Sequence, residues 1–242
     1  MCPVPFIFKD THTDSKMIRR DYVLRMIAEF LEVLRRIQNL KRSQLWQEAR
    51  STVQEQCRQL MGADALELAK LSETELLARL IQGEPTQVVR DKAFMLARLF
   101  QEAGDVAAGE DKLEESRALY LKGLHLLLYT LAEGEPAEWP EFLPRVDLFV
   151  TTLGEASVPF ATQAALMQYY ERTGQYGRAE DAFFRLQEAE PARLGLTEFG
   201  IAFYERLRGR TDVALAEGNL PRGEVEAGLA ALRRQAGREI GG

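Results

Sequence analysis

The chain has 242 residues, of which 46% are hydrophobic and 28% are charged, a composition and length that suit a globular protein with a sizeable core. Its formal net charge is −6, which argues against a free-standing nucleic-acid-binding protein because such proteins usually carry a basic face. Its two cysteines, Cys2 and Cys57, are too few for a disulfide scaffold and fit a reducing compartment better.

The first residues of the chain lack an apolar period, and we interpret residues 1–16 as a disordered or loosely packed extension. They begin without a basic stretch and contain no small-residue cleavage site, so we expect no signal peptide. The longest apolar run, near Leu124–Ala132, is far shorter than the roughly 20 residues of a membrane span. We therefore expect a cytoplasmic protein that does not enter a membrane, with a single α-helical domain over residues 17–242. One alternative is that translation begins at Met17.

Along most of the chain, apolar residues recur at the spacings typical of amphipathic helices. Ser72 and Glu75 form a capping-box pattern at one helix start, and Gly62 is a plausible helix stop. The predicted helices span residues 17–40, 45–61, 64–70, 73–81, 86–103, 110–131, 138–153, 192–208 and 224–238, with a helix pair in residues 161–191. Loops are predicted at residues 104–109 and 209–221, and an interruption near Pro144. No segment alternates as a strand does, so the fold class is predicted to be all-α.

Basic residues are concentrated near the start of this helical region. Residues 17–50 contain eight basic and four acidic side chains, a local balance of 8 − 4 = +4. We interpret them as a solvated helix face. The alternative is a docking patch for an acidic partner.

One stretch, residues 161–191, combines seven spaced positions that suit a helix–turn–helix unit. These are Leu166, Tyr170, Gly174, Tyr176, Ala179, Phe183 and Pro191. Glycine at 174 permits a tight turn, alanine at 179 permits close helix crossing, and proline at 191 stops the second helix. The pattern resembles the tetratricopeptide repeat, a helix–turn–helix of about 34 residues.

Two weaker copies precede this unit. In the first, Leu96, Ala97, Phe100 and Gly104 repeat the first helix, and Leu113, Ser116, Tyr120 and Gly123 repeat the second. Gly104 stands 12 positions before Ser116, against 5 from Gly174 to Ala179, so an insertion of 12 − 5 = 7 residues is predicted around residues 107–112. In the faintest copy, Leu40, Trp46, Ala49 and Val53 fit, with Gln44 in place of the turn glycine. The alternative for this copy is an ordinary helix-pair core.

The resemblance implies antiparallel helix pairs in a short, divergent right-handed solenoid. The start MIRRDYVLRMI also resembles an uncharacterised bacterial family with tetratricopeptide-like helices. That second resemblance implies no particular activity.

The residues that usually carry catalysis are scarce. The two histidines, His12 and His125, form no paired metal motif, and we expect His125 to be packed in an apolar helix. No phosphate-binding glycine loop or nucleophile elbow occurs. Acidic pairs such as Glu114–Glu115 and Glu180–Asp181 are expected to be solvated. We therefore predict no catalytic residue, no metal, no cofactor and no enzymatic activity.

The remaining candidate is a helical groove. In tetratricopeptide arrays the first helix of each unit lines the concave face, and such grooves bind peptides. By this resemblance the groove residues are Phe94, Arg98, Gln101, Glu102, Ala164, Gln168, Glu171 and Arg172. The alternative is that the C-terminal helix, residues 224–238, fills the groove. We expect a protein-interaction or scaffold module whose partner is a protein or peptide, with a second copy of the chain as one option. The second hypothesis is a regulatory sensor that binds a small molecule or peptide between helices.

Overall fold

The computed structural model of the protein consists of helices joined by turns and short loops in the part of the chain that it describes. The described residues are 11–82, 86–134, 140–154 and 158–240, and they contain twelve helices and no strand. The all-α prediction is confirmed in this part of the chain. The chain divides into two compact units, one within residues 1–123 and 139–145 and the other within residues 124–138 and 146–242.

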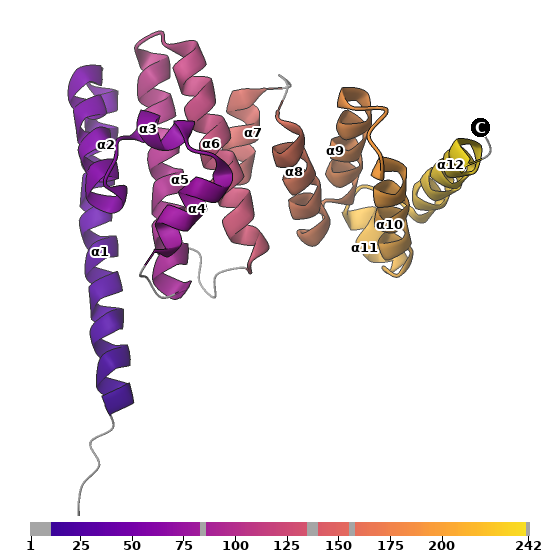
Figure 1. The fold of residues 1–242 in the computed structure, drawn as a ribbon, viewed down its shortest axis with the longest axis horizontal. Helices are drawn as coiled ribbons and strands as arrows, with labels where there is room; N and C mark the ends of the chain where they lie inside the picture. Colours follow the sequence, from indigo (N-terminus) through magenta and orange to yellow (C-terminus); the bar gives the residue numbers. More distant parts are fainter. Residues whose placement is uncertain (1–10, 83–85, 135–139, 155–157, 241–242) are drawn as a thin grey trace, which may run out of the picture. The chain divides into compact units, whose positions relative to one another are not determined.

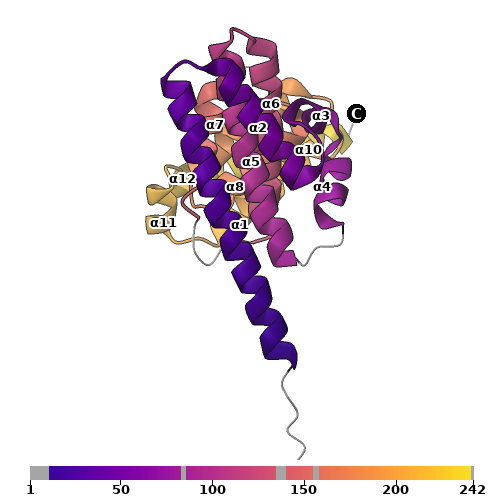
Figure 2. The same cartoon turned by 90° about the vertical axis from the view of Figure 1, so that its left-hand side faces the viewer.

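The first unit is organised around its central helix, α5 (Thr86–Gly109) (Figure 1). Its helices are α1 (Thr11–Arg42), α2 (Trp46–Met61), α3 (Ala65–Lys70), α4 (Glu73–Ile81), α5 (Thr86–Gly109) and the first half of α6 (Leu113–Ala132). Helices α1, α2, α3 and α4 all contact α5, and α1 also contacts α2. Because α5 lies at the centre, its side chains Phe94, Leu96 and Phe100 are fully buried. Helix α1 runs well beyond the rest of this unit at its N-terminal end (Figure 2).

The second unit contains the rest of α6 followed by six helices. These are α7 (Val146–Leu153), α8 (Phe160–Arg172), α9 (Tyr176–Ala189), α10 (Leu196–Arg208), α11 (Asp212–Glu217) and α12 (Arg222–Ile240). Helix α8 pairs with α9, and α12 packs on α10 and α11. Phe183 and Tyr204 are buried at these contacts. Gly200 of α10 allows the close approach, since a Cβ there would stand 2.2 Å from the Phe183 ring.

The same turn joins helices at four places in the chain. Its central residue has a positive φ of 57° at Gln44, 60° at Asp111, 75° at Gly174 and 58° at Asn219. In each turn this residue donates its N–H to the carbonyl three residues before it, and the next residue donates to the carbonyl five residues before itself. These paired bonds are the Schellman arrangement that satisfies free carbonyls at a helix end. The chain therefore reuses one turn geometry with four different residue types.

The predicted loop at residues 104–109 is wrong, because α5 continues through Gly109. The true turn residue of this pair is Asp111, and it stands 5 positions before Ser116, as Gly174 stands before Ala179. The extra residues therefore lengthen the first helix of the pair, which continues through Gly109 instead of ending at Gly104. Gly104 does not form a turn. It lies within α5 against the ring of Tyr120.

Other boundaries agree or shift by a few residues. Helix α4 matches its predicted span, and the Ser72–Glu75 capping box is present. Helices α8 and α9 occupy the predicted pair at residues 161–191. Residues 140–145 are not helical and α7 begins only at Val146, while α11 lies inside the predicted loop at 209–221. Of the predicted extension, residues 11–16 belong to α1, and residues 1–10 lie outside the described part of the chain.

Candidate functional site

The expected groove residues of the first unit are closed off from solvent. Phe94 and Glu102 have no exposed surface and Gln101 is 5% exposed, so these three do not line an open surface. The Arg98 side chain donates to the Glu102 carboxylate at 2.5 Å. Lys41, from the end of α1, donates to Glu102 and to Asp105. This face of α5 is therefore occupied by an internal ion cluster between α1 and α5.

The register of the weaker repeat copy explains this outcome. With Asp111 as the turn residue, the equivalents of Gln168 and Glu171 are Asp105 and Ala108, seven residues after Arg98 and Gln101. Seven residues make nearly two turns of about 3.6 residues each, so the shift keeps the same face of the helix but moves along it. The predicted residues therefore lie nearly two helical turns further along α5 from the turn at Asp111 than the positions that match Gln168 and Glu171.

The expected groove residues of the second unit are more accessible. Gln168 is exposed and Ala164 is half-buried on α8. Glu171 accepts two hydrogen bonds from Arg206 of α10, at 2.7 and 2.8 Å. Arg172 donates to the carbonyls of Leu131 and Ala132, so it closes the C-terminal end of α6. Of the four expected groove residues in this unit, Gln168 and Ala164 have no hydrogen bond or ion pair to another helix within the described residues.

The C-terminal helix has its own packing partners. Leu232 of α12 lies beside Gly200 of α10, and Gly228 of α12 lies against the ring of Tyr204 of α10. Arg233 of α12 pairs with Glu205 of α10 at 2.8 Å. These contacts place α12 over α10, rather than over Ala164 and Gln168 of α8.

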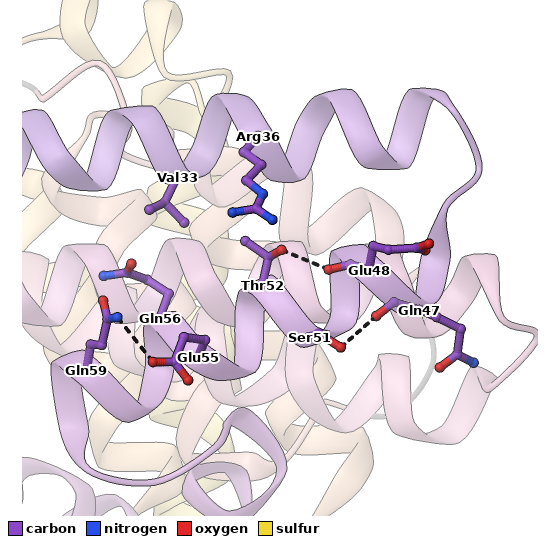
Figure 3. A pocket seen from close by; sticks show the side chains of 9 residues that line it. All are labelled: Val33, Arg36, Gln47, Glu48, Ser51, Thr52, Glu55, Gln56 and Gln59. Atoms are coloured by element: carbon purple, nitrogen blue, oxygen red, sulfur yellow. Dashed lines mark hydrogen bonds between the residues drawn. The ribbon is translucent and has the colours of Figure 1, made fainter.

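A groove lined mainly by polar residues lies between α1 and α2 in the first unit (Figure 3). Its volume is about 580 Å³, and its lining is Val33, Arg36, Gln47, Glu48, Ser51, Thr52, Glu55, Gln56 and Gln59. The Ser51 and Thr52 hydroxyls donate to carbonyls four residues earlier in α2, and Gln59 donates to Glu55. A second hollow continues along α1 on the other side of Arg36, with Asn39 and Ser43 in its lining.

The groove keeps its hydrogen-bonding capacity because its side chains bond only within α2. Arg36, Gln47 and Gln56 make no hydrogen bond or ion pair within the described residues. Figure 3 shows the Arg36 guanidinium directed toward α2 near Thr52. The groove therefore presents the Arg36 cation, two amides and the Glu48 carboxylate to whatever enters it.

The basic excess of residues 17–50 is partly neutralised inside the first unit. Arg50 donates to Glu110, in the turn after α5, at 2.9 Å and to Glu115 of α6 at 2.6 Å. These hydrogen bonds raise the pKa of Arg50 and, acting from the other side, lower the pKa of Glu110. Lys41 is neutralised by Glu102 and Asp105, as described above. Arg35, Arg36 and Arg42 remain exposed on α1.

A second cleft lies in the second unit between α7 and the α8–α9 pair. Its volume is about 590 Å³. Its lining is Val150, Thr151, Gly154, Val158, Phe160, Gln163, Leu166, Tyr170, Arg185, Leu186, Glu188 and Ala189. Leu166, Tyr170 and Leu186 are buried and form an apolar floor, whereas Thr151, Arg185 and Glu188 are exposed. This cleft could not be predicted from the sequence, because its walls come from three helices whose facing sides become known only once they pack.

Two reactive side chains of the described residues, Cys57 and His125, are buried or hydrogen-bonded. Cys57 is fully buried, and burial raises the pKa of its thiol to about 12. The His125 ring nitrogen Nδ1 lies 3.0 Å from the Thr162 hydroxyl of α8, and His12 is a residue of α1. Within the described ranges, no cluster of three His, Cys, Asp or Glu side chains has a geometry that could hold a metal ion. None of the helices searched combines the length and apolarity needed to cross a bilayer.

Comparison with known proteins identifies a family for this chain. Residues 17–237 match the model of a family described as a family of unknown function (DUF6483). The match begins at the residue where the helical domain was predicted to begin. No curated protein and no solved structure matches the chain.

Proposed function

Because the chain belongs to this family of unknown function, we propose a function from its own residues: it is a non-enzymatic interaction module that binds a protein partner in a helical groove. The observation that carries this proposal is the groove between α1 and α2. Most of its side chains are polar and include hydrogen-bond donors and acceptors. Arg36, Gln47 and Gln56 make no hydrogen bond or ion pair to another helix within the described residues. Such a surface suits a polypeptide segment, whose backbone offers both donors and acceptors.

The architecture behind the groove is, in this proposal, a set of tetratricopeptide-like antiparallel pairs forming a short right-handed solenoid. Support comes from the three pairs α1–α2, α5–α6 and α8–α9, which share the positive-φ turn. Each pair also has a small buried residue five positions after that turn: Ala49, Ser116 and Ala179. A small residue at this place lets the second helix approach its neighbours closely. The first pair would present the polar outer face that a terminal repeat needs for solubility.

The proposal includes the cellular compartment and the kind of partner. We place it in the cytoplasm of a bacterium, where a free thiol such as Cys57 is stable. Its partner would be another protein or a second copy of the chain, and neither a membrane nor a nucleic acid.

Affinity purification with mass spectrometry tests the groove. The variant Arg36→Glu reverses the charge that faces α2, and Arg42→Glu is the matched control, since Arg42 is exposed on the same helix and lines neither hollow. We expect a partner that is recovered with wild type and with Arg42→Glu but lost with Arg36→Glu. Equal recovery with both variants would remove the groove from the proposal. Arg98 is not a suitable test position, because it is bonded to buried Glu102.

The second candidate function is a regulatory sensor that binds a ligand between helices. The cleft between α7 and the α8–α9 pair favours it, because the cleft joins an apolar floor to a few polar groups, as ligand sites do. Ligand binding there would shift the packing of α7 against the pair. Hydrogen exchange of α7 with and without ligand tests that shift.

A further inference from the structure

The cleft of the second unit has the dimensions of a small-ligand site. Its volume of about 590 Å³ falls in the range of roughly 300–1,000 Å³ that is usual for such sites. Phe160, Gln163, Leu166 and Tyr170 reach it from one side of α8, since they are spaced by three or four residues. Leu166, Tyr170 and Leu186 are each at most 3% exposed and are held by the pairing of α8 with α9. The floor is therefore apolar and preformed.

Nearby arginines are already committed, with one exception. Arg178 donates to Asp147, Gln175 and the Tyr170 hydroxyl, and its guanidinium lies over the Tyr170 ring. Arg193 pairs with Glu190 and lies over the Phe160 ring. Arg185 makes no hydrogen bond or ion pair within the described part of the chain, although it lines the cleft. It is the cation that remains available to a ligand there.

An uncommitted anion stands beside it. Glu188 lies three residues after Arg185 on α9, lines the same cleft, and likewise makes no hydrogen bond or ion pair within the described residues. Residues three apart on a helix have Cβ atoms about 5–6 Å apart, yet these two side chains do not form an ion pair with each other. The rim of the cleft therefore carries one positive and one negative group, close together and both free.

The N-terminus of α8 and the C-terminus of α9 also favour a negative and a positive ligand group, respectively, at this cleft. The first turn of α8 carries no acidic residue and no side-chain cap, and its residues Phe160 and Gln163 line the cleft. A helix N-terminus favours negative charge and a C-terminus favours positive charge. Ala189, the last residue of α9, also lines the cleft.

From this geometry we propose that the cleft binds a zwitterionic ligand with a large apolar side chain, either a free apolar amino acid or a short peptide with free termini. Arg185 pairs with the ligand carboxylate, Glu188 pairs with its ammonium group, and the apolar side chain lies on Leu166, Tyr170 and Leu186. A neutral apolar ligand would leave both charges unused, and a simple organic acid would meet the repulsion of Glu188. The inference deepens the sensor proposal above and rests on it only for the regulatory consequence of binding.

Isothermal titration calorimetry of the full chain tests the ligand class with four probes. L-phenylalanine and the dipeptide L-leucyl-L-phenylalanine carry both charges, whereas N-acetyl-L-phenylalanine lacks the ammonium group and phenethylamine lacks the carboxylate. We expect binding of one or both zwitterions, with the two singly charged analogues weaker by about tenfold, as the loss of one charge-assisted hydrogen bond implies. Equal binding of all four probes, or of none, would overturn the proposal. The stronger of the two zwitterions identifies amino acid or peptide as the source.

Variants locate the site. Arg185→Gln and Glu188→Gln are each expected to weaken binding by about tenfold, whereas Arg234→Gln, an exposed arginine on α12, is expected to have no effect. Thr151→Trp is expected to block the cleft, and Thr152→Trp is its control, since Thr152 is equally exposed on α7 but does not line the cleft. Binding that survives Thr151→Trp would place the ligand elsewhere. Binding without any change in hydrogen exchange of α7 would keep this site and reject the sensor function.

Discussion

Gly104 on α5 lies directly against the ring of Tyr120 on α6, so closely that a Cβ atom at residue 104 would stand 2.6 Å from the ring carbon Cδ2. The Tyr120 hydroxyl donates to Asp105, the next residue along α5. Tyr120 is 3% exposed, so its ring has little room to move. The absence of a side chain at residue 104 therefore sets how closely these two helices pack.

The variant Gly104→Ala should lower the free energy of unfolding by about 1–3 kcal/mol, the usual cost of overpacking a core. Urea denaturation measures the change. The control is Gly237→Ala in α12, where an added Cβ meets no atom within 4 Å. Alanine there should raise stability by up to about 1 kcal/mol, because alanine is the better helix former. Similar effects at the two positions would contradict the contact.

The equivalent turn residues Gln44 and Gly174 should respond in opposite directions to substitution. Both have a positive φ, 57° at Gln44 and 75° at Gly174, which costs a residue with a Cβ about 1–2 kcal/mol. Gly174→Ala should therefore lower the midpoint of thermal unfolding, and Gln44→Gly should raise it. A decrease for both variants would show that the Gln44 side chain contributes something that its backbone geometry does not explain.

The sequence was sufficient to predict the all-α class and the pair α8–α9, because apolar spacing and Gly174 directly determine helix faces and a turn. It was not sufficient to place the turn before α6. Glycine at residue 104 suggested a turn, but glycine also serves where two helices touch, and only the position of Tyr120 distinguishes the two uses. Asp111 adopts the turn geometry without glycine, and its residue type did not mark it as the turn, whereas the spacing of Leu40, Trp46 and Ala49 did place Gln44 at the turn position.

The groove residues show the same limit. Arg98 and Glu102 carry charges that usually mark a surface, and nothing local to α5 shows that Glu102 is buried and paired with Lys41 of α1 as well as with Arg98. The cleft beside α7 depends in a similar way on the packing of three separate helices. Charge and spacing predict the faces of a helix, whereas the packing of other helices decides which charged face is covered.

The carboxylate of Glu102 is fully buried between Lys41 and Arg98. Glu102→Gln should lower the free energy of unfolding by about 3 kcal/mol, the low end for a broken buried ion pair, because Lys41 and Arg98 are partly exposed. Chemical denaturation provides the measurement. Glu205→Gln is the control, since Glu205 and its partner Arg233 are each about half exposed; the change there should stay below about 1 kcal/mol. A small effect at residue 102 would mean that Asp105 alone satisfies Lys41.

Glu110 should make stability depend on pH in the acidic range. Its hydrogen bonds from Arg50 hold its pKa below the usual 4.5, against an opposing effect of burial. The folded state therefore binds fewer protons than the unfolded chain below pH 4.5, so the stabilisation is fully present above that pH and is lost as the pH falls through the lowered pKa. Glu110→Gln should be less stable than wild type at neutral pH, with the difference shrinking on acidification. Urea titrations of wild type and variant at neutral pH and at a pH below 4.5 test this, and a difference in stability that stays constant between the two would contradict it.

Cys57 should be unreactive while the protein is folded. Its side chain has no exposed surface, and burial raises the pKa of the thiol to about 12, with nearby Asp64 acting in the same direction. Thiol reagents attack the thiolate, so reaction requires unfolding to expose the sulfur. A Cys2→Ser variant leaves Cys57 as the sole thiol. It should not react with Ellman's reagent in native buffer and should titrate as one thiol in guanidinium chloride. Rapid labelling of the native variant would mean that α2 opens locally, away from α5.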